Sequence, residues 1–206
     1  MPAHKSHRIG GRIVKSHEAH ETIEETLEGH RNKRIAILIA ILAALLAVAE
    51  MGGGNAKQDA LNANINASNL WSFFQAKTIR QTVLRTAAET MELEAADLSP
   101  PRAEAFKKRI DAWKATVARY DSEPDTQEGR KELMARAKEA EATRDRALAA
   151  DHVFEIGSAS LQLGIVLASA AVITGALWLA FAAMGLGAVG AVCVALGWFA
   201  PTMMQF

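Results

Sequence analysis

Residues 156–206 read IGSASLQLGIVLASAAVITGALWLAFAAMGLGAVGAVCVALGWFAPTMMQF and contain no Asp, Glu, Lys or Arg. One membrane-spanning helix needs about 20 apolar residues, and this uncharged run is more than twice that length. The run therefore predicts two membrane spans joined by a tight turn. We place the spans at residues 156–183 and 185–206, with the turn near Met184–Gly187.

A second apolar run, Ile35–Ala49, lies toward the other end of the chain. Its Ile, Leu and Val residues favour insertion into a bilayer by about 3–5 kcal/mol. A cleaved signal peptide is not expected, because a polar segment rich in Glu precedes the run. We assign residues 35–54 to a first span and interpret Gly52–Gly54 as a flexible joint at the membrane surface.

Glu50 interrupts this first span close to its end. It lies about 24 Å along the helix, near the far interface of a hydrocarbon core about 30 Å thick. A carboxylate at that depth costs less than one at the centre, so an interfacial side chain that reaches water is expected. The alternative is a functional intramembrane acid that relays protons or ions.

The cations beside the first span indicate its orientation. Arg31, Lys33 and Arg34 precede the span, whereas no cation follows it before Lys57. Positive residues next to a span stay in the cytoplasm. We therefore expect the polar, His- and Glu-rich segment 1–34 to be cytoplasmic and residues 55–155 to be periplasmic or otherwise extracytoplasmic.

The polar middle of the chain reads as a helical hairpin. Residues 55–98 contain neither Pro nor Gly, so they predict one long helix continuing the first span. Ser99-Pro100-Pro101 ends it, because the residue before a proline is disfavoured in a helix. A second helix runs to the breaking sequence Asp121–Asp125, and a third begins at about Thr126. The return leg must match the outgoing one in length, so we expect an antiparallel hairpin kinked near Pro124.

Both pieces of the return leg carry apolar residues three and four positions apart. Such a seam is typical of a helix that packs along another helix. A hairpin this thin buries little surface by itself, so we expect it to associate with copies of itself. The two seams are Ala103, Phe106, Ile110, Trp113, Val117 and Tyr120, and the weaker Leu133, Ala137, Ala140, Ala147 and Phe154.

Small residues recur every fourth position in the uncharged run. Small side chains let helix backbones approach closely in lipid. We expect them to join the second and third spans of one chain, with contact between subunits as the alternative. Trp178 and Trp198 are expected near opposite ends of the two spans, as interfacial anchors. The small-residue series are Ser160, Gly164 and Ala168, then Ala171 and Gly175, then Gly187, Ala191 and Ala195.

Composition argues against several classes of function. Lys+Arg and Asp+Glu both number 23, so nothing favours nucleic-acid binding. The single cysteine, Cys193, excludes an intramolecular disulfide. The sequence contains no Gly-rich phosphate loop, no Cys/His pair and no Gly-x-Ser-x-Gly elbow. We therefore predict no catalytic residue, no cofactor and no enzymatic activity.

A metal site is one chemical candidate before the first span, and a pH-sensing role for the histidines is another. His17, His20, Glu21 and Glu24 fall on one face of a predicted helix capped by Ser16. Imidazole and carboxylate groups suit zinc or nickel. A solvated, weakly amphipathic cytoplasmic helix is the competing and commoner interpretation of the same pattern.

The run NLWSFFQAK at residues 69–77 follows the first span by some 15–20 residues. With the His/Glu-rich start and the paired C-terminal spans, it resembles a bacterial inner-membrane family catalogued as a domain of unknown function, number four-three-three-seven. The resemblance implies the same layout in the inner membrane and supplies no chemistry. The motif-like residues are Trp71, Phe74, Gln75 and Lys77, which we interpret as an aromatic cluster packed between hairpins, with a ligand-binding role as the alternative.

The sequence thus predicts an all-α membrane protein with three transmembrane helices and a long extramembrane antiparallel helical hairpin. We expect a non-enzymatic, homo-oligomeric helical scaffold held in the lipid bilayer of the inner membrane. One alternative is a subunit of an ion- or metal-permeable channel or transport complex that uses Glu50 and the N-terminal histidines. Another is an accessory subunit of a larger membrane complex.

Overall fold

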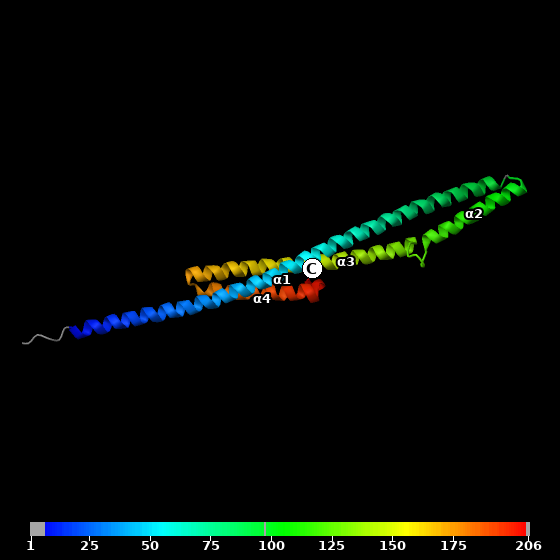
Figure 1. The fold of residues 1–206 in the computed structure, drawn as a ribbon. Coiled ribbons are helices and arrows are strands. Elements are labelled where there is room, and N and C mark those ends of the chain that lie inside the picture. Colours follow the sequence, from blue (N-terminus) through cyan, green and yellow to red (C-terminus); the bar gives the residue numbers. More distant parts are fainter. Residues whose placement is uncertain (1–6, 97, 205–206) are drawn as a thin grey trace, which may run out of the picture. The chain divides into compact units, whose positions relative to one another are not determined.

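A computed structural model describes residues 7–96 and 98–204, and every regular element in this part of the chain is helical (Figure 1). Side chains are described from Arg31 to Met203, except at residue 97. The prediction of an all-α fold is therefore confirmed for these residues. The elements are α1 (His7–Ala95), α2 (Pro100–Asp121), α3 (Arg130–Thr174), α4 (Leu177–Phe199) and the short 3₁₀ helix η1 (Pro201–Met204).

The chain divides into two compact units. We call Met1–Gly54 together with Ala150–Phe206 the apolar unit, and Asn55–Ala149 the hairpin unit. Helices α1 and α3 contribute to both units, whereas α2 belongs to the hairpin unit and α4 to the apolar unit.

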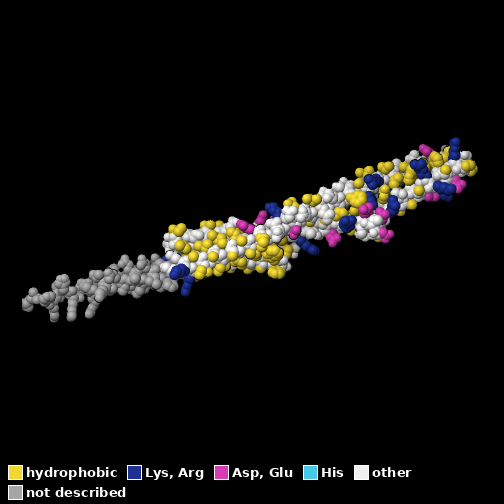
Figure 2. Space-filling view, in the orientation of Figure 1, with side chains coloured by type: hydrophobic (Ala, Val, Ile, Leu, Met, Phe, Trp, Pro, Cys, Tyr) yellow, Lys and Arg dark blue, Asp and Glu magenta, His cyan; other side chains and the backbone are white. Residues whose placement is uncertain are grey.

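Three helices, α1, α3 and α4, are each long and apolar enough to cross a membrane by length and composition. In the apolar unit many large side chains face outward, and Figure 2 shows hydrophobic side chains over its surface. The inside holds many small residues around a few large ones, among them Leu42, Phe154 and Leu161. This arrangement suits a lipid surrounding, where close backbone packing joins helices without expulsion of water. The exposed set includes Ile37, Ile41, Val166, Ile173, Phe181 and Val192, and the buried set includes Ala168, Ala171, Ala180 and Ala183.

The turn between α3 and α4 lies at Gly175–Ala176, so the predicted position near Met184–Gly187 was wrong. Gly175 has a φ of 71°, and its N–H donates to the Ala171 carbonyl at 3.0 Å. A glycine adopts this left-handed conformation without strain and commonly ends a helix. The expected segments 156–183 and 185–206 are therefore replaced by helices that end at Thr174 and begin at Leu177.

Small residues bring α3 and α4 into close contact, which confirms the expected packing within one chain. A Cβ atom at Gly164 would lie 3.2 Å from the Ala183 carbonyl oxygen, and one at Gly190 would lie 3.1 Å from the Gly157 carbonyl oxygen. The predicted series ending in Ala195 was wrong, because that residue is exposed. The buried face of α4 is Ala180, Ala183, Gly187, Gly190, Cys193, Val194 and Gly197.

Two corrections concern Trp178 and the glycines Gly52–Gly54 of α1. Trp178 and Trp198 lie near opposite ends of α4 alone, because the turn precedes both. Gly52–Gly54 are helical and form no joint. Gly52 instead makes room for the ring of Phe154: a Cβ atom there would lie 2.6 Å from Phe154 Cζ. One at Gly197 would lie 2.8 Å from the same atom, so the ring occupies a slot between α1 and α4.

The hairpin unit has the expected breaks. Helix α1 ends at Ala95, and α2 begins at Pro100 after Ser99, whose extended ψ of 149° matches the preference of a residue before proline. Helix α2 ends at Asp121, and α3 begins at Arg130, four residues later than predicted. The delay follows from the link at residues 122–129, where Gln127 adopts a positive φ of 58°.

Both predicted seams of the hairpin unit face its inside. Ile110 is the buried centre of the α2 seam, and Leu133, Ala137 and Ala140 are buried on α3. The latter three pack against Ala67 and Leu70 of α1, with Trp71, Phe73 and Phe74 beside them. Residue numbers rise on α1 as they fall on the return leg, from Trp71 against Glu141 to Glu92 against Lys114. The legs are therefore antiparallel, as predicted.

Candidate functional site

Three residues of the family-like motif face the return leg, and Lys77 meets the link between α2 and α3. Trp71, Phe74 and Lys77 are three residues apart on α1, and this spacing turns all three toward the return leg. Around them lies a cluster that we call the polar elbow: Lys77, Thr78, Gln81, Asp121, Ser122, Glu123, Glu128, Arg130, Lys131 and Glu132. It joins α1, α2, α3 and residues 122–129.

Lys77 is the buried cation of the polar elbow, with 5% of its surface exposed. Its Nζ lies 3.5 Å from Glu123 Oε2 and 3.9 Å from Glu128 Oε2. It also lies 5.3 Å from the ring centroid of Phe73 and 5.4 Å from that of Tyr120. Burying an ammonium group is costly unless anions and aromatic faces replace its water, and both are present here.

Arg130 begins α3 and reaches back to α1. Its Nε donates to Thr78 Oγ1 at 2.9 Å, its Nη1 donates to Gln81 Oε1 at 2.5 Å, and its guanidinium lies over the Phe74 ring at 5.0 Å. A cation at a helix N-terminus opposes the helix dipole. Asp121 offsets this by pairing with Arg130 Nη1 at 3.5 Å.

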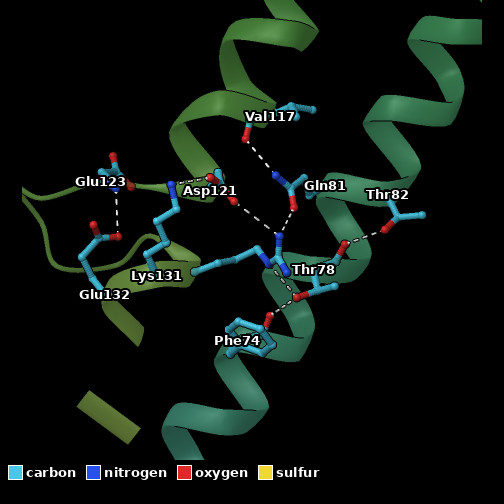
Figure 3. Close-up of polar contacts among 10 residues, drawn as sticks. Phe74, Thr78, Gln81, Thr82, Val117, Asp121, Glu123, Lys131 and Glu132 are labelled. Atoms are coloured by element: carbon cyan, nitrogen blue, oxygen red, sulfur yellow. Dashed lines mark hydrogen bonds and ion pairs between the residues drawn. The ribbon is translucent and has the colours of Figure 1, made fainter. Parts of the chain in front are cut away.

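Gln81 connects all three helices of the elbow (Figure 3). Its carbonyl oxygen accepts from Arg130 of α3, and its Nε2 donates to the Val117 carbonyl of α2 at 3.2 Å. Only 5% of its surface is exposed. Both ends of this buried amide are therefore satisfied, which avoids the cost of an unpaired buried polar group.

Glu132 fastens the α2–α3 link to the first turn of α3 (Figure 3). Its carboxylate accepts from Ser122 Oγ at 2.7 Å and from the Glu123 N–H at 3.1 Å. These hydrogen bonds, that from Ser122 first, lower the pKa of Glu132. Gly129 is required here, since a Cβ atom would overlap the Glu123 nitrogen.

Trp71 completes the aromatic side of the site. Its indole Nε1 donates to Glu141 Oε1 at 2.8 Å, and its ring meets Phe74 edge to face at a centroid distance of 5.4 Å. Trp71, Phe74 and Lys77 therefore pack within one hairpin, and their predicted packing between hairpins stays a prediction. Gln75 differs, because it is exposed on α1.

The remaining sequence candidates lie elsewhere. Glu50 is exposed on α1, next to the fully buried Ala49. The side chains of His17, His20, Glu21 and Glu24 fall outside the described residues, so the predicted metal site stays a prediction. Their backbone is helical from His7 onward, so Ser16 lies inside α1 and cannot be its cap. Among the described residues, no three His, Cys, Asp or Glu side chains are grouped to hold a metal.

The charged groups of the polar elbow form ion pairs with one another, and these pairs connect α1, α2, α3 and the link between α2 and α3. Sequence reasoning did not identify Gln81, Glu123 or Arg130 as parts of it. Two features of the sequence were weak signals for these residues. Gln81 lies four residues after Lys77 on the same helix face, and Arg130 directly follows Gly129. The contacts of the polar elbow hold residues 122–130, between α2 and α3, against the turn of α1 that contains Lys77, Thr78 and Gln81.

We expect the polar elbow to weaken in acid through Asp121. The hydrogen bond from Lys131, at 3.0 Å, holds the pKa of Asp121 below its ordinary 3.8, with further lowering by the charges of Lys131 and Arg130. A lowered folded-state pKa stabilises the fold above pH 3.8, and the effect is lost as the pH falls through the lowered value. Asp121→Asn should therefore unfold more easily than the native protein at about pH 7, and the difference should shrink as the pH falls below 3.8.

Thermal unfolding followed by circular dichroism across that pH range measures the difference. Asp125→Asn, at an exposed position of the same link, is the control and should show no such trend. A difference between Asp121→Asn and the native protein that stays constant with pH would contradict the assignment.

The chain matches a family model over most of its length. The family model described as Domain of unknown function (DUF4337) matches residues 31–200. The matched range holds the three helices that could cross a membrane, apart from the start of α1, and the whole polar elbow. No curated protein and no solved structure matches the chain significantly.

Proposed function

We propose, from the premise that the chain belongs to the family described as Domain of unknown function (DUF4337), a non-enzymatic helical scaffold that assembles from copies of itself in the inner membrane. The apolar unit holds the protein in the bilayer through α1, α3 and α4. The hairpin unit lies in the periplasm and provides the surface for assembly.

The observation that carries this proposal is the apolar surface of the hairpin unit. Five large apolar residues of α1 are more than half exposed there: Leu61, Ile65, Ile79, Val83 and Leu93. This unit lies outside the uncharged segments, so lipid does not cover these side chains. Exposed apolar residues of this kind mark an interaction surface when they gather on one face.

The paired state of the polar elbow supports a structural role. A catalytic acid or base must be free to form a hydrogen bond with the substrate group to or from which it transfers a proton. In the elbow, Lys77, Arg130 and Glu132 already bind neighbouring groups of the same hairpin. Their evident task is to fix the shape of the hairpin.

The placement in the membrane rests on the ends of the apolar unit. A Cβ atom at Gly175 would lie 3.6 Å from Arg31 Nη2, so Arg31 marks the same end as the α3–α4 turn. With Lys33 and Arg34 exposed beside it, this end is the cytoplasmic one by the positive-inside rule. Impermeant thiol reagents should then label Lys114→Cys, but not Arg34→Cys, from the periplasm.

Native mass spectrometry of the full-length protein in a mild detergent tests the scaffold itself. We expect one discrete oligomer, retained on dilution to low micromolar concentration. A uniform monomer, in detergent and in lipid nanodiscs alike, would contradict the proposal. Co-purification in fixed ratio with an unrelated chain would favour an accessory subunit instead.

A further inference from the structure

Helix α1 carries two seams in the hairpin unit, on opposite faces. The inner seam packs against α2 and α3, and its buried members include Ala60, Ala67, Leu70, Lys77, Gln81 and Ala88. A second series runs along the other side with the same spacing of three and four. We call it the outer stripe: Asn62, Ile65, Asn69, Ser72, Ala76, Ile79, Val83, Thr86, Thr90 and Leu93.

Among the described residues, no helix packs over the outer stripe. All its members are exposed except Ala76, which is half-buried. The exposed fractions reach 65% at Ile79 and 77% at Leu93. The spacing is that of positions a and d of a coiled coil, which normally face a partner helix.

No member of the outer stripe is charged. A solvated face of this size would carry about three Lys, Arg, Asp or Glu residues. The charged residues of α1 in this unit lie off the stripe: Lys57, Asp59, Lys77, Arg80, Arg85, Glu89, Glu92 and Glu94. The pattern is therefore that of a contact surface flanked by charge.

The polar members of the stripe can be buried at little cost. The Ser72 hydroxyl donates to the Ser68 carbonyl at 2.9 Å, and the Thr90 hydroxyl donates to the Thr86 carbonyl at 3.0 Å. Asn62 Oδ1 already accepts from Gln58 Nε2 at 3.3 Å. Hydroxyl groups bonded to their own helix lose no hydrogen bond when a partner covers them.

We propose that the outer stripe binds the outer stripe of a second copy of this chain, in parallel and in register. This inference rests on the proposed scaffold, because copies held in one bilayer point their hairpins the same way. Parallel pairing in register places each layer opposite itself: Asn62 meets Asn62, and Ile79 meets Ile79.

Complementarity favours a copy over an unrelated partner. Asn62 and Asn69 stand one heptad apart at equivalent positions of the seam. An Asn in such a seam is satisfied by an Asn at the same level of the partner, and it specifies register. Polar layers thus meet polar layers and apolar layers meet apolar layers only when the partner repeats the pattern.

The area is sufficient for a specific contact. The stripe is about 50 Å long and one helix, about 10 Å, wide. It therefore covers about 500 Å² on each copy, or about 1,000 Å² in total, which reaches the lower limit of specific interfaces. Anchoring in one bilayer adds effective concentration to this modest area.

The flanking charges add one detail. Glu89 and Glu94 lie beside the far end of the stripe, at positions that face each other between parallel copies. Like charges there weaken the pairing near Leu93. Contact is therefore expected to be firmest around Ser72 and to loosen beyond Val83.

Site-directed cross-linking of the full-length protein in lipid nanodiscs tests the stripe. In a Cys193→Ser background, Ser72→Cys should form a disulfide-linked dimer under copper phenanthroline and oxygen at least about tenfold faster than Ala142→Cys. Ala142 is exposed on α3, away from the stripe. Leu93→Cys should react at an intermediate rate.

A charge test accompanies it. Ile79→Lys with Val83→Lys should reduce cross-linking at Ser72→Cys by about tenfold, whereas Met134→Lys, at an exposed apolar residue of α3, should leave it unchanged. Circular dichroism confirms that helix content is retained. Should the variants fold but cross-link like Met134→Lys, the stripe is not the interface.

The outcomes separate this inference from the proposed function. Equal, slow cross-linking at Ser72→Cys and Ala142→Cys, with an oligomer still present by native mass spectrometry, overturns the stripe and leaves the scaffold standing. A monomer by mass spectrometry overturns both. When the same cross-linking is run in native membranes, a Ser72→Cys adduct with an unrelated chain would show that another protein covers the stripe and would overturn the pairing of copies.

Discussion

Lys77→Glu is expected to lower the free energy of unfolding by about 3–5 kcal/mol, the cost of leaving buried charge uncompensated. The native ammonium group lies between Glu123 and Glu128 and over the rings of Phe73 and Tyr120. A carboxylate in its place would meet two like charges and the negative faces of two rings. Urea unfolding of the full-length protein in detergent, followed by circular dichroism, measures the loss.

Two variants test that the effect belongs to the site. Lys57→Glu reverses the same charge at an exposed position of the same helix and should change stability by less than about 0.5 kcal/mol. Lys77→Met keeps the apolar stem without the charge and should fall between native and Lys77→Glu. Equal stability of Lys77→Glu and Lys57→Glu would show that the elbow does not hold the hairpin.

Gly52→Ala is expected to destabilise the apolar unit by about 1–3 kcal/mol, although the change adds only a methyl group. That methyl would lie 2.6 Å from Phe154 Cζ, closer than atoms can approach. The ring cannot withdraw freely, because Gly197 of α4 holds its other side. Resistance to thermal unfolding in detergent, or retention of the native mass spectrum on heating, reports the change.

The matched control lies two residues away. A Cβ atom at Gly54 meets nothing within 4 Å, so Gly54→Ala should stabilise α1 by about 0.5–1 kcal/mol through helix propensity. Phe154→Leu should relieve much of the effect of Gly52→Ala, because a smaller side chain leaves the slot open. Additive losses in the double variant would argue against a shared contact.

The breaks at proline could be predicted from the sequence, because proline restricts the backbone of its own neighbour. Ser99-Pro100 therefore marked the start of α2 closely. The turn at Gly175 could not be placed in the same way. The uncharged run contains several glycines that could each form a turn, and most of them allow close helix packing instead. They include Gly164, Gly175, Gly185, Gly187, Gly190 and Gly197. Only the three-dimensional fit decides which of them adopts a positive φ.

The candidate site was predictable on one helix and not across helices. The spacing of Trp71, Phe74 and Lys77 places them on one face, and this follows from helix geometry. Their partners Glu123 and Arg130 lie about 50 residues further along the chain, in and after an irregular link. Which charge meets which depends on where α2 ends and α3 begins, and no local pattern determines that to one residue.

The two-residue connection at Gly175–Ala176 has a mechanical consequence. With so little chain between them, α3 and α4 cannot slide past each other and, in the proposed membrane placement, would move as a pair. Leu42 of α1 meets this pair at Gly164 and Gly187, where Cβ atoms would lie 3.3 Å and 2.5 Å from its methyl carbons. In the proposed membrane placement, adjustment to a thicker or thinner bilayer would therefore change the contact between Leu42 and that pair.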